Sequence, residues 1–514
     1  MNTIKERMPA YGMPVLEGPL NKPEPVDVRA MMLAQMGDEL PPLKPENTEI
    51  KPCPPTCRPS EHPGSVPGAD IPPGTPGPGM PGGGPPKAPD FPRMESMDVL
   101  DGTLYTAEHP YAEITGEITD TGMKNASYKT DEVCLNGIYI GGNSAYAIED
   151  STFEMNGYGI NDFAGIGSAV MVNDTAKCHM ERVNITTHGV IRPCTTVTGN
   201  GTLVVRNCVL DAKGGEIPKS YVPRVASGMM EPPPGLKLGG NCRTHLSMGN
   251  SRAYFYDSKI LAHSWAALST DGSDGDLYLE ANRCEIVCDT VGYATYADGG
   301  CHNVLNDCNI SVDTHVAIIA GDAWVKLNGC TATSNRYGAM LHGVRGHYTE
   351  TTECHIVGGS WNVGEALFFV KSRDVYLKLD HAKVTTGKYL IHSVVNEDPA
   401  RTMVPEELKL KVYGVNAVIA NGEYSGDIIH EDDERTMNVT LQNAVLTGCV
   451  QDAYLKLEQS KWYATENSSV CLVGPAAPEQ LDAPAGVTIQ AVCGEGCELH
   501  GDYPLPSGGV LTIQ

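Results

Sequence analysis

Basic residues and histidines gather between Arg336 and Arg373, in a chain that is otherwise strongly acidic. Four Lys or Arg and three His stand there against three Glu: Arg336, Arg345, Lys371, Arg373, His342, His347 and His355. Arg and Lys hold carboxylates and other anions, so we expect Arg336, Arg345 and Lys371 to bind an anionic substrate. His342 and Tyr337 would move a proton near neutral pH. The His spacing is irregular, and no metal site is predicted.

Carboxylates form a second group just ahead of this zone. Asp298 and Asp322 occur at similar places in successive repeats, and Asp271 and Asp274 belong to the repeat before. Two carboxylates held close together serve as acid and base or as a Ca²⁺ cage, because closeness separates their pKa values. Asp before Gly, as in Asp298-Gly299, is equally ordinary turn chemistry. The sequence leaves both interpretations open; in the first, Asp298 and Asp322 assist catalysis.

These residues are positioned by a repeated phrase whose cysteines are 24, 22 and 24 residues apart: Asn282-Arg-Cys284, Asn306-Asp-Cys308, Asn328-Gly-Cys330 and Thr352-Glu-Cys354. Each phrase precedes a short β-rich run. A repeat of this length cannot close its own core and must stack on its neighbours, as in a solenoid. Asn tolerates the left-handed turn between two sheets, and the Cys would stack inward as a small apolar residue.

Stacked coils place residues at one offset from the marker in a column. Seven residues after the markers Ser258, Cys284, Cys308, Cys330, Cys354 and Ala382 lie Trp265, Val291, His315, Tyr337, Trp361 and Tyr389. An aromatic column in a chain with only 6% aromatics offers ring faces for sugars,. The alternative is a stack that only supports the sheet. His315 and His302, on neighbouring coils, are further substrate-binding candidates.

The coil pattern resembles the right-handed parallel β-helix superfamily of pectate lyases and polygalacturonases over roughly residues 133–462. The resemblance implies an all-β, right-handed parallel β-helix. It implies little about activity, because one fold hosts many functions. The paired Asp and Gly-His-Gly pattern of polygalacturonases is not evident. The segment His342-Gly-Val-Arg345-Gly-His347 matches that pattern only loosely.

The rest of the chain divides by composition. We expect an extended arm with a possible short helix over 1–50, a Pro/Gly-rich linker over 51–95 and cap strands over 96–144. The β-helix itself would span 145–474, followed by a C-terminal cap over 475–514. An insertion at 213–250 contains Asn241-Cys-Arg243-Thr-His245, and we expect a wall or lid there, with Arg243 and His245 contacting substrate,.

The formal net charge of −26 argues against nucleic acid or an anionic membrane as a partner,. There is no leader-like apolar run at the N-terminus and no stretch of membrane-spanning length. The 17 cysteines are then most simply reduced thiols of a cytoplasmic protein,. The Pro-rich arm gains order only against another surface, which favours a homo-oligomer. No cofactor can be named.

Together these features favour an intracellular enzyme that acts on a small polyhydroxylated or anionic ring, such as a sugar acid. Proton abstraction would make it a lyase or an isomerase or epimerase. A non-catalytic carbohydrate-binding or assembly solenoid is the first alternative. A glycoside hydrolase using paired Asp is the second.

Overall fold

A computed structural model describes two compact units, and the boundary between them in the sequence lies between Thr314 and His315. The first unit is the described chain up to residue 314, and the second begins at residue 315. The described residues are 94–106, 111–159, 165–217, 230–232, 238–271, 277–321, 323–343, 351–397 and 414–514.

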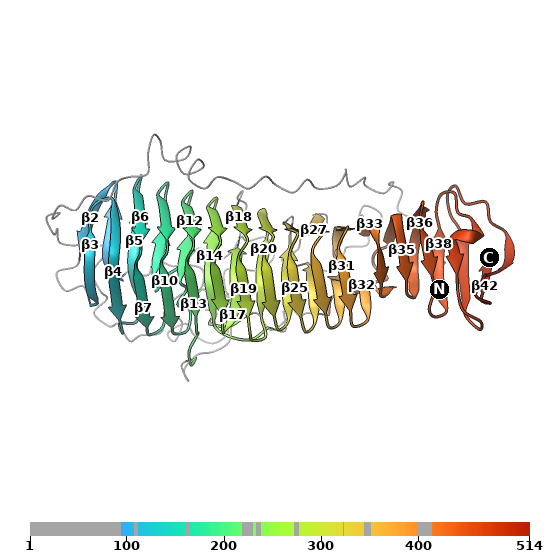
Figure 1. The fold of residues 1–514 in the computed structure, drawn as a ribbon, viewed down its shortest axis with the longest axis horizontal. Helices are drawn as coiled ribbons and strands as arrows, with labels where there is room; N and C mark the ends of the chain where they lie inside the picture. The colour runs from blue at the N-terminus through green and yellow to red at the C-terminus, as the bar shows by residue number, and fades with distance from the viewer. Residues whose placement is uncertain are drawn as a thin grey trace. The chain divides into compact units, whose positions relative to one another are not determined.

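The first unit is built from three parallel sheets, because each strand pairs with the strand three places further along the chain. Within the unit, the strands of successive coils lie side by side (Figure 1). Sheet A contains β5 (Leu135–Gly141), β8 (Val170–Val172), β11 (Thr195–Val197), β14 (Cys242–Met248), β17 (Trp265–Asp271) and β20 (Tyr293–Asp298). Sheet B contains β6 (Ala145–Glu149), β9 (Lys177–Glu181), β12 (Thr202–Arg206), β15 (Arg252–Tyr256), β18 (Leu277–Asn282) and β21 (Cys301–Asn306). Sheet C contains β4 (Gly122–Thr130), β7 (Thr152–Asn156), β10 (Asn184–His188), β13 (Val209–Ala212), β16 (Lys259–Ala262), β19 (Glu285–Cys288) and β22 (Asn309–Val312).

Three further strands begin this unit: β1 (Met94–Leu100), β2 (Thr103–Thr106) and β3 (Glu113–Ile118). β1 extends sheet A by pairing parallel to β5, whereas β2 and β3 pair antiparallel to β1 and β4. Antiparallel strands at the start of a parallel array limit further edge pairing.

The second unit repeats the same three-strand coil, and the sheets keep the same names. Sheet A contains β23 (His315–Ala320), β26 (Tyr337–His342), β29 (Ala366–Lys371), β32 (Tyr389–Val394) and β34 (Asp427–His430). Sheet B contains β24 (Trp324–Asn328), β27 (Thr351–Val357), β30 (Asp374–Asp380), β33 (Val415–Ser425), β35 (Met437–Thr447), β36 (Val450–Glu458), β38 (Ser468–Leu472), β40 (Thr488–Cys493) and β42 (Val510–Ile513). Sheet C contains β25 (Thr331–Ser334), β28 (Ser360–Val363), β31 (Lys383–Thr386), β37 (Lys461–Tyr463) and β39 (Leu481–Asp482). The second halves of β33 and β35 also pair in sheet C.

Both units are therefore mostly parallel β arrays, and this arrangement is compatible with a β-solenoid. The predicted all-β class is confirmed at that level. Strand residues alternate between core and surface, as in β22, where Ile310 and Val312 are buried and their neighbours are exposed,. Ala, Val, Ile, Leu and Cys make up most of the buried hydrophobic residues, and Trp265, Trp361 and Trp462 are also fully buried.

The Asn and Cys of the repeated phrase behave partly as predicted. Asn306 Nδ2 donates to Asn282 Oδ1 across one coil at 2.9 Å. The buried thiols of Cys284 and Cys308 lie within hydrogen-bonding reach of each other. The Asn itself is not the turn residue, however. The left-handed backbone falls on the next residue, with φ of 53° at Arg283 and 51° at Asp307.

The fourth phrase, Thr352-Glu-Cys354, does not mark a coil in this register. Cys354 pairs with Val325 and Leu377 inside sheet B. Asn328 pairs with Val357, so the residue opposite Cys330 is Gly359. The alignment on Cys354 is therefore wrong by five residues, because the coil before it is longer than its neighbours.

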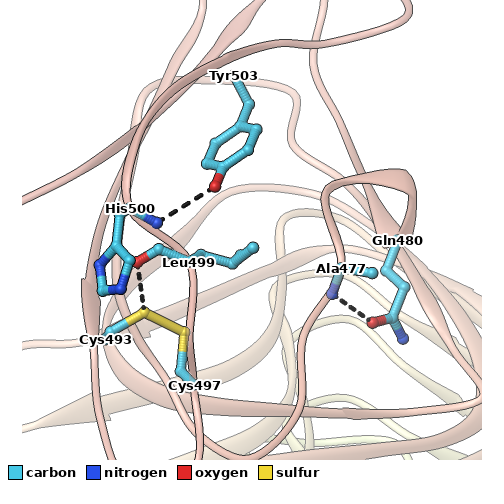
Figure 2. Close-up of a disulfide and its surroundings, with 7 residues drawn as sticks. All are labelled: Ala477, Gln480, Cys493, Cys497, Leu499, His500 and Tyr503. Carbon is cyan, nitrogen blue, oxygen red and sulfur yellow. Dashed lines mark hydrogen bonds between the residues drawn. A yellow bond between two sulfur atoms is a disulfide. The ribbon is translucent and has the colours of Figure 1, made fainter.

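The C-terminal end of the second unit carries a disulfide between Cys493 and Cys497 (Figure 2). Two glycines between them let the chain fold back, with Gly496 at φ 77°, and the Cα atoms approach to 5.2 Å,. The prediction of reduced thiols is wrong for this pair. The free cysteines that the structure describes are all buried. Nearby, β41 (Gly501–Pro504) pairs antiparallel to β42, and η5 (Pro478–Gln480) is a single 3₁₀ turn.

Several predicted features lie outside the described residues: the 1–50 arm, nearly all of the 51–95 linker and much of the 213–250 insertion. Asp274, Asp322, Arg345 and His347 also lie outside them. In the part of the chain that is described, no helix is long and apolar enough to cross a bilayer.

Candidate functional site

Two carboxylates lie opposite each other at the ends of neighbouring strands in the first unit. Asp271 is the last residue of β17 and Asp298 the last residue of β20, and the parallel register pairs them directly. Neighbouring parallel strands are about 4.8 Å apart. We call Asp271 and Asp298 the carboxylate pair. Such closeness is the geometry in which one carboxyl group can act as an acid and the other as a base.

An arginine from the preceding strand neutralises one member of the pair. Arg243 Nη1 donates to Asp271 Oδ2, and both side chains are at least nine-tenths buried. The Arg243 guanidinium also lies 4.4 Å from the centre of the Trp265 ring. Stacking on an indole is favourable for a partly dehydrated cation. The ion pair and the indole contact together hold the Arg243 guanidinium against Asp271.

The other member of the carboxylate pair, Asp298, is contacted by the hydroxyl group of a tyrosine. Tyr296, two residues earlier on the same strand, donates its hydroxyl to Asp298 Oδ2 at 3.3 Å. Both residues are 8% exposed. Gly300, with φ 70°, turns the chain just after Asp298. Among the described residues, Asp298 accepts no backbone N–H of that turn, so turn capping does not account for its carboxylate.

The strands that carry this pair are held from inside the coil. Thr270 Oγ1 donates to the backbone carbonyl of Tyr296 at 2.7 Å and to Asn303 Oδ1 at 3.0 Å. Asn303 Nδ2 in turn donates to Thr295 Oγ1 at 2.9 Å. Thr270 precedes Asp271 and Thr295 precedes Tyr296, so this buried network positions each functional side chain from the opposite face of its strand.

The sequence pointed to Asp298 but paired it with Asp322, which lies outside the described residues. The direct partner in the first unit is Asp271. Counting twelve residues from the markers Ser258 and Cys284 would place Tyr296 opposite Thr270, whereas the register pairs it with Ser269. The discrepancy arises at Trp265 and Gly292, where the later coil contains one extra residue. Trp265 has a φ of 92°, and a side chain at Gly292 would collide with the Trp265 carbonyl oxygen.

The predicted aromatic column exists in the second unit with different membership. His315, Tyr337 and Tyr389 share one column through Ala366, but Trp361 is fully buried on β28 opposite Ala332. In the first unit, exposed Val291 does not continue the column. The rings that stack in the second unit, which we call the aromatic ladder, are His315, Tyr337, Phe369, His392 and Tyr389.

The ladder rings stack on one another. Tyr337 and Phe369 are nearly parallel with centroids 4.7 Å apart, and His315 covers Tyr337 at 5.1 Å. At the edge, Arg336 binds Glu365 at 2.9 Å and donates to the Tyr337 hydroxyl at 2.9 Å. Because neighbouring rings occupy the faces that a sugar would need, this geometry favours the supporting interpretation.

His342 and Tyr337 stand at opposite ends of β26, roughly 17 Å apart along the strand at about 3.3 Å per residue,. The structure therefore does not bring them to one reaction centre. Burial raises the pKa of Tyr337 to about 12. Burial, with the positive charges of Lys371 and Arg373, lowers the pKa of His342 to about 3. Neither group is poised to exchange a proton near neutral pH.

The remaining predicted residues separate into different environments. Lys371 is the direct register neighbour of His342. His245 points into the core, where it bonds Thr195 Oγ1 at 2.8 Å and Ser247 Oγ at 2.7 Å, and burial lowers its pKa to about 3. His302 lies on β21 in sheet B, opposite Tyr278. Arg243 and Trp265 lie at the starts of β14 and β17, whereas Asp298 ends β20. Only the long Arg243 side chain reaches the carboxylate pair, through its bond to Asp271.

Within the described ranges, no group of three His, Cys, Asp or Glu is arranged to hold a metal ion. The carboxylate pair is instead associated with an arginine and a phenol, which suits proton transfer better than cation binding. The chain matches no family model and no curated protein sequence. Its function must therefore be argued from its own residues.

Proposed function

We propose that the chain is a right-handed parallel β-helix enzyme that abstracts a proton from a small anionic ring compound of the sugar-acid type. It would be a lyase or an epimerase, with Asp298 as the base. The observation that supports this most directly is the carboxylate pair, in register at two strand ends, with Arg243 on one member and Tyr296 on the other.

The different partners of the two carboxylates support different roles. Asp271 is bonded to a buried cation, Arg243, and its carboxylate is engaged in that ion pair. Asp298 receives only a neutral phenol in the described part of the chain. We therefore assign the base to Asp298, which is not engaged in an ion pair in the described part of the chain, and Asp271 holds Arg243 in place.

The proposed chemistry begins at the carbon next to the substrate carboxylate. Asp298 takes the proton from that carbon, and the electron pair moves onto the carboxylate as an enediolate, whose charge Arg243 stabilises. Elimination follows if the group on the next carbon leaves with its bonding pair. Epimerisation follows if a proton returns to the opposite face of the carbon. Tyr296 is the nearest hydroxyl donor for either the leaving group or the returning proton.

Burial limits the size of the substrate. Asp298 and Tyr296 are each only 8% exposed, which favours a single small ring over a long polymer,. The glycoside hydrolase remains a second candidate, because the two carboxylates belong to register neighbours on adjacent strands and retaining enzymes use two carboxyl groups only about 5–5.5 Å apart,. The non-catalytic alternative is favoured by the self-stacked aromatic ladder, which offers little open ring surface.

A product assay separates these possibilities. Uronic acids and their short glycosides are incubated with the wild type, Asp298→Asn and the control Asp289→Asn, whose carboxylate is on the exposed side of sheet C. Elimination yields an unsaturated product that absorbs ultraviolet light, epimerisation a new sugar acid by NMR, and hydrolysis only new reducing ends. We expect one of the first two, lost in Asp298→Asn and kept in Asp289→Asn. Hydrolysis, or activity retained in Asp298→Asn, would overturn the proposal.

A further inference from the structure

Side chains that point away from the core of sheet B are buried in the first unit. Asn303 and Leu305 lie inside the coil, so strand alternation directs Val304 outward,. Val304 is nevertheless only 6% exposed. It belongs to a register column that we call the outer face of sheet B: His179, Val204, Tyr254, Glu280 and Val304. Within this column, Val204 is fully buried and Glu280 is 6% exposed.

The outside of sheet C in the same unit is different. On each strand from β10 to β22 its outward residues are half-buried or exposed, whereas the alternate residues are buried. Lys259 and Glu285, for example, are exposed register neighbours. Two sheets of the same coils would have similar exposure if water reached both. The outer face of sheet B is therefore covered, whereas the outside of sheet C is open.

The cover comes from this chain, because these exposures are those of a single copy. Every described strand of the first unit belongs to the three sheets or to the starting strands, so none of them lies over this face. The insertion at 213–250 leaves sheet C and returns to sheet A, at the corner opposite sheet B. Between sheets A and B of this unit, only the five residues 272–276 lie outside the described ranges. The candidate that remains is the segment before β1.

That segment has the composition and the length to cover a sheet. Residues 51–92 contain 15 Pro and 8 Gly. Because Pro lacks the N–H that joins a sheet edge, such a segment is suited to cross the face of a sheet in an extended, polyproline-like form. At about 3.1 Å per residue, about eight residues cross six strands that are about 4.8 Å apart. The segment joins the first unit directly, at Met94 of β1.

The side chains on the outside of sheet B suit a proline-rich ligand. The rings of Tyr254 and Tyr278 lie with their centroids 5.9 Å apart. Arg252 is the register neighbour of Tyr278, and Tyr256 points to the same side as Tyr254,. Proline rings pack on aromatic rings, and phenol and guanidinium groups donate to the carbonyl groups that a polyproline segment leaves open.

We propose that residues 51–93 bind the outer face of sheet B in the first unit of their own chain, with proline rings against Val204, Tyr254 and Val304. This interaction goes beyond the proposed reaction, because the carboxylate pair lies on sheet A. It assigns the Pro-rich segment to its own chain and not to a neighbouring copy.

Cross-linking of the full chain tests the location. An equal mixture of ¹⁴N- and ¹⁵N-labelled protein is treated with an amine-reactive cross-linker, and the linked peptides are identified by mass spectrometry. We expect Lys87 to link to Lys177, outward on β9 of sheet B, in preference to Lys259, which is outward on sheet C and more exposed. Each Lys87–Lys177 link should join peptides of one isotope, because both lysines belong to one chain.

A matched pair of variants tests the contact. Val204→Asp places a carboxylate on the outer face of sheet B, and Val209→Asp places one on the outside of sheet C in the same coil. Both side chains point outward, so neither change opens a cavity in the core. Because burying an unpaired charge is costly, Val204→Asp should release the segment and speed tryptic cleavage after Lys87 and Arg93 about tenfold or more. Val209→Asp should be cleaved as the wild type is.

Equal cleavage of the two variants would overturn the proposal. So would equal linking of Lys87 to Lys177 and Lys259, because the segment would then have no fixed place on the coil. Links that mostly join the two isotopes would assign the outer face of sheet B to a second copy, which also overturns it. If Val204→Asp fails to fold, the cross-links of the wild type still decide.

Discussion

The same position of the coil carries chemically different side chains in the two units. In the first unit, the last residues of β17 and β20 are Asp271 and Asp298. In the second, the last residues of β26 and β29 are His342 and Lys371. The backbone is equivalent, since each residue ends a strand of sheet A and is paired in register. The chemistry is therefore set by the side chains alone.

The two regions differ in the groups that surround their charged side chains. Asp271 has a bonded arginine, and Asp298 has a phenol that holds it without adding charge. In the second unit, burial, with the positive charges of Lys371 and Arg373, lowers the pKa of His342 to about 3. The first arrangement suits the proton transfer that we propose, whereas the second keeps its histidine from taking up a proton near neutral pH. Each prediction below tests one side of this contrast.

The largest expected effect is on turnover. Asp298→Asn removes the proposed base but keeps the size of the side chain. Loss of a general base typically costs about 10²–10⁴ in rate. We expect kcat/KM to fall by that factor with little change in thermal stability, whereas Lys371→Met leaves kcat within a few fold. Equal losses in the two variants would mean that the contrast between the sites is false.

Breaking the buried ion pair should have the largest effect on stability. Asp271→Ala leaves Arg243 charged and buried, which costs about 3–5 kcal/mol of unfolding free energy. Removing both charges in Arg243→Met/Asp271→Leu should recover most of that loss. Urea denaturation of the singles and the double measures the coupling. If the double variant is as unstable as Asp271→Ala, the loss of stability does not come from leaving Arg243 charged and unpaired.

The third prediction concerns acid stability. The pKa of His342 is lowered from 6.5 to about 3 in the folded chain, so the unfolded chain binds the proton first. Stability is therefore lost as the pH falls from about 6.5 towards 3, at up to about 1.4 kcal/mol per pH unit. His245 shifts in the same direction and contributes similarly.

His342→Gln should remove the His342 contribution to the pH dependence of the unfolding free energy. The His245 contribution should remain. Denaturation followed between pH 7 and pH 4 measures the slope. An unchanged slope would mean that the His342 ring takes up its proton as readily in the folded chain as in the unfolded chain, and it would contradict the lowered pKa.

The smallest effects are expected at the left-handed corner between sheets B and C. Gly329 in the second unit and Arg283 in the first both adopt it, with φ of 63° and 53°. Gly329→Ala should cost about 1–2 kcal/mol, because a Cβ is strained there. Arg283→Gly should change stability by less than about 1 kcal/mol, since relief of strain offsets loss of the exposed bond to Asp257,. Thermal melting compares the two, and similar losses would contradict this account of the corner.

The sequence predicted the coil well because its markers sit at fixed places in the core. The spacing of Cys284 and Cys308 and the stacked Asn282 and Asn306 gave the strand period and the parallel stacking. The prediction of the columns failed where a coil changes length at a corner. One extra residue before Gly292 and a longer coil before Cys354 left the strand pattern intact but moved the columns.

The candidate site was predicted in part for the same reason. Asp298 and Arg243 were identified by residue type, but their partners Asp271 and Tyr296 depend on a register that turns control. The neutral state of His342 could not be read from its neighbours in sequence, because burial decides it. Residue types therefore showed which groups could react, and packing decides which of them can act together.

Deuterium exchange at the substrate carbon tests the central claim most directly. The sugar acid that the product assay identifies is incubated in D₂O with the wild type or Asp298→Asn, and the carbon next to its carboxylate is followed by NMR. The account predicts that the wild type replaces the proton on that carbon with deuterium and that Asp298→Asn does not. Turnover by the wild type without deuterium entering product or recovered substrate, or equal exchange in both proteins, would contradict it.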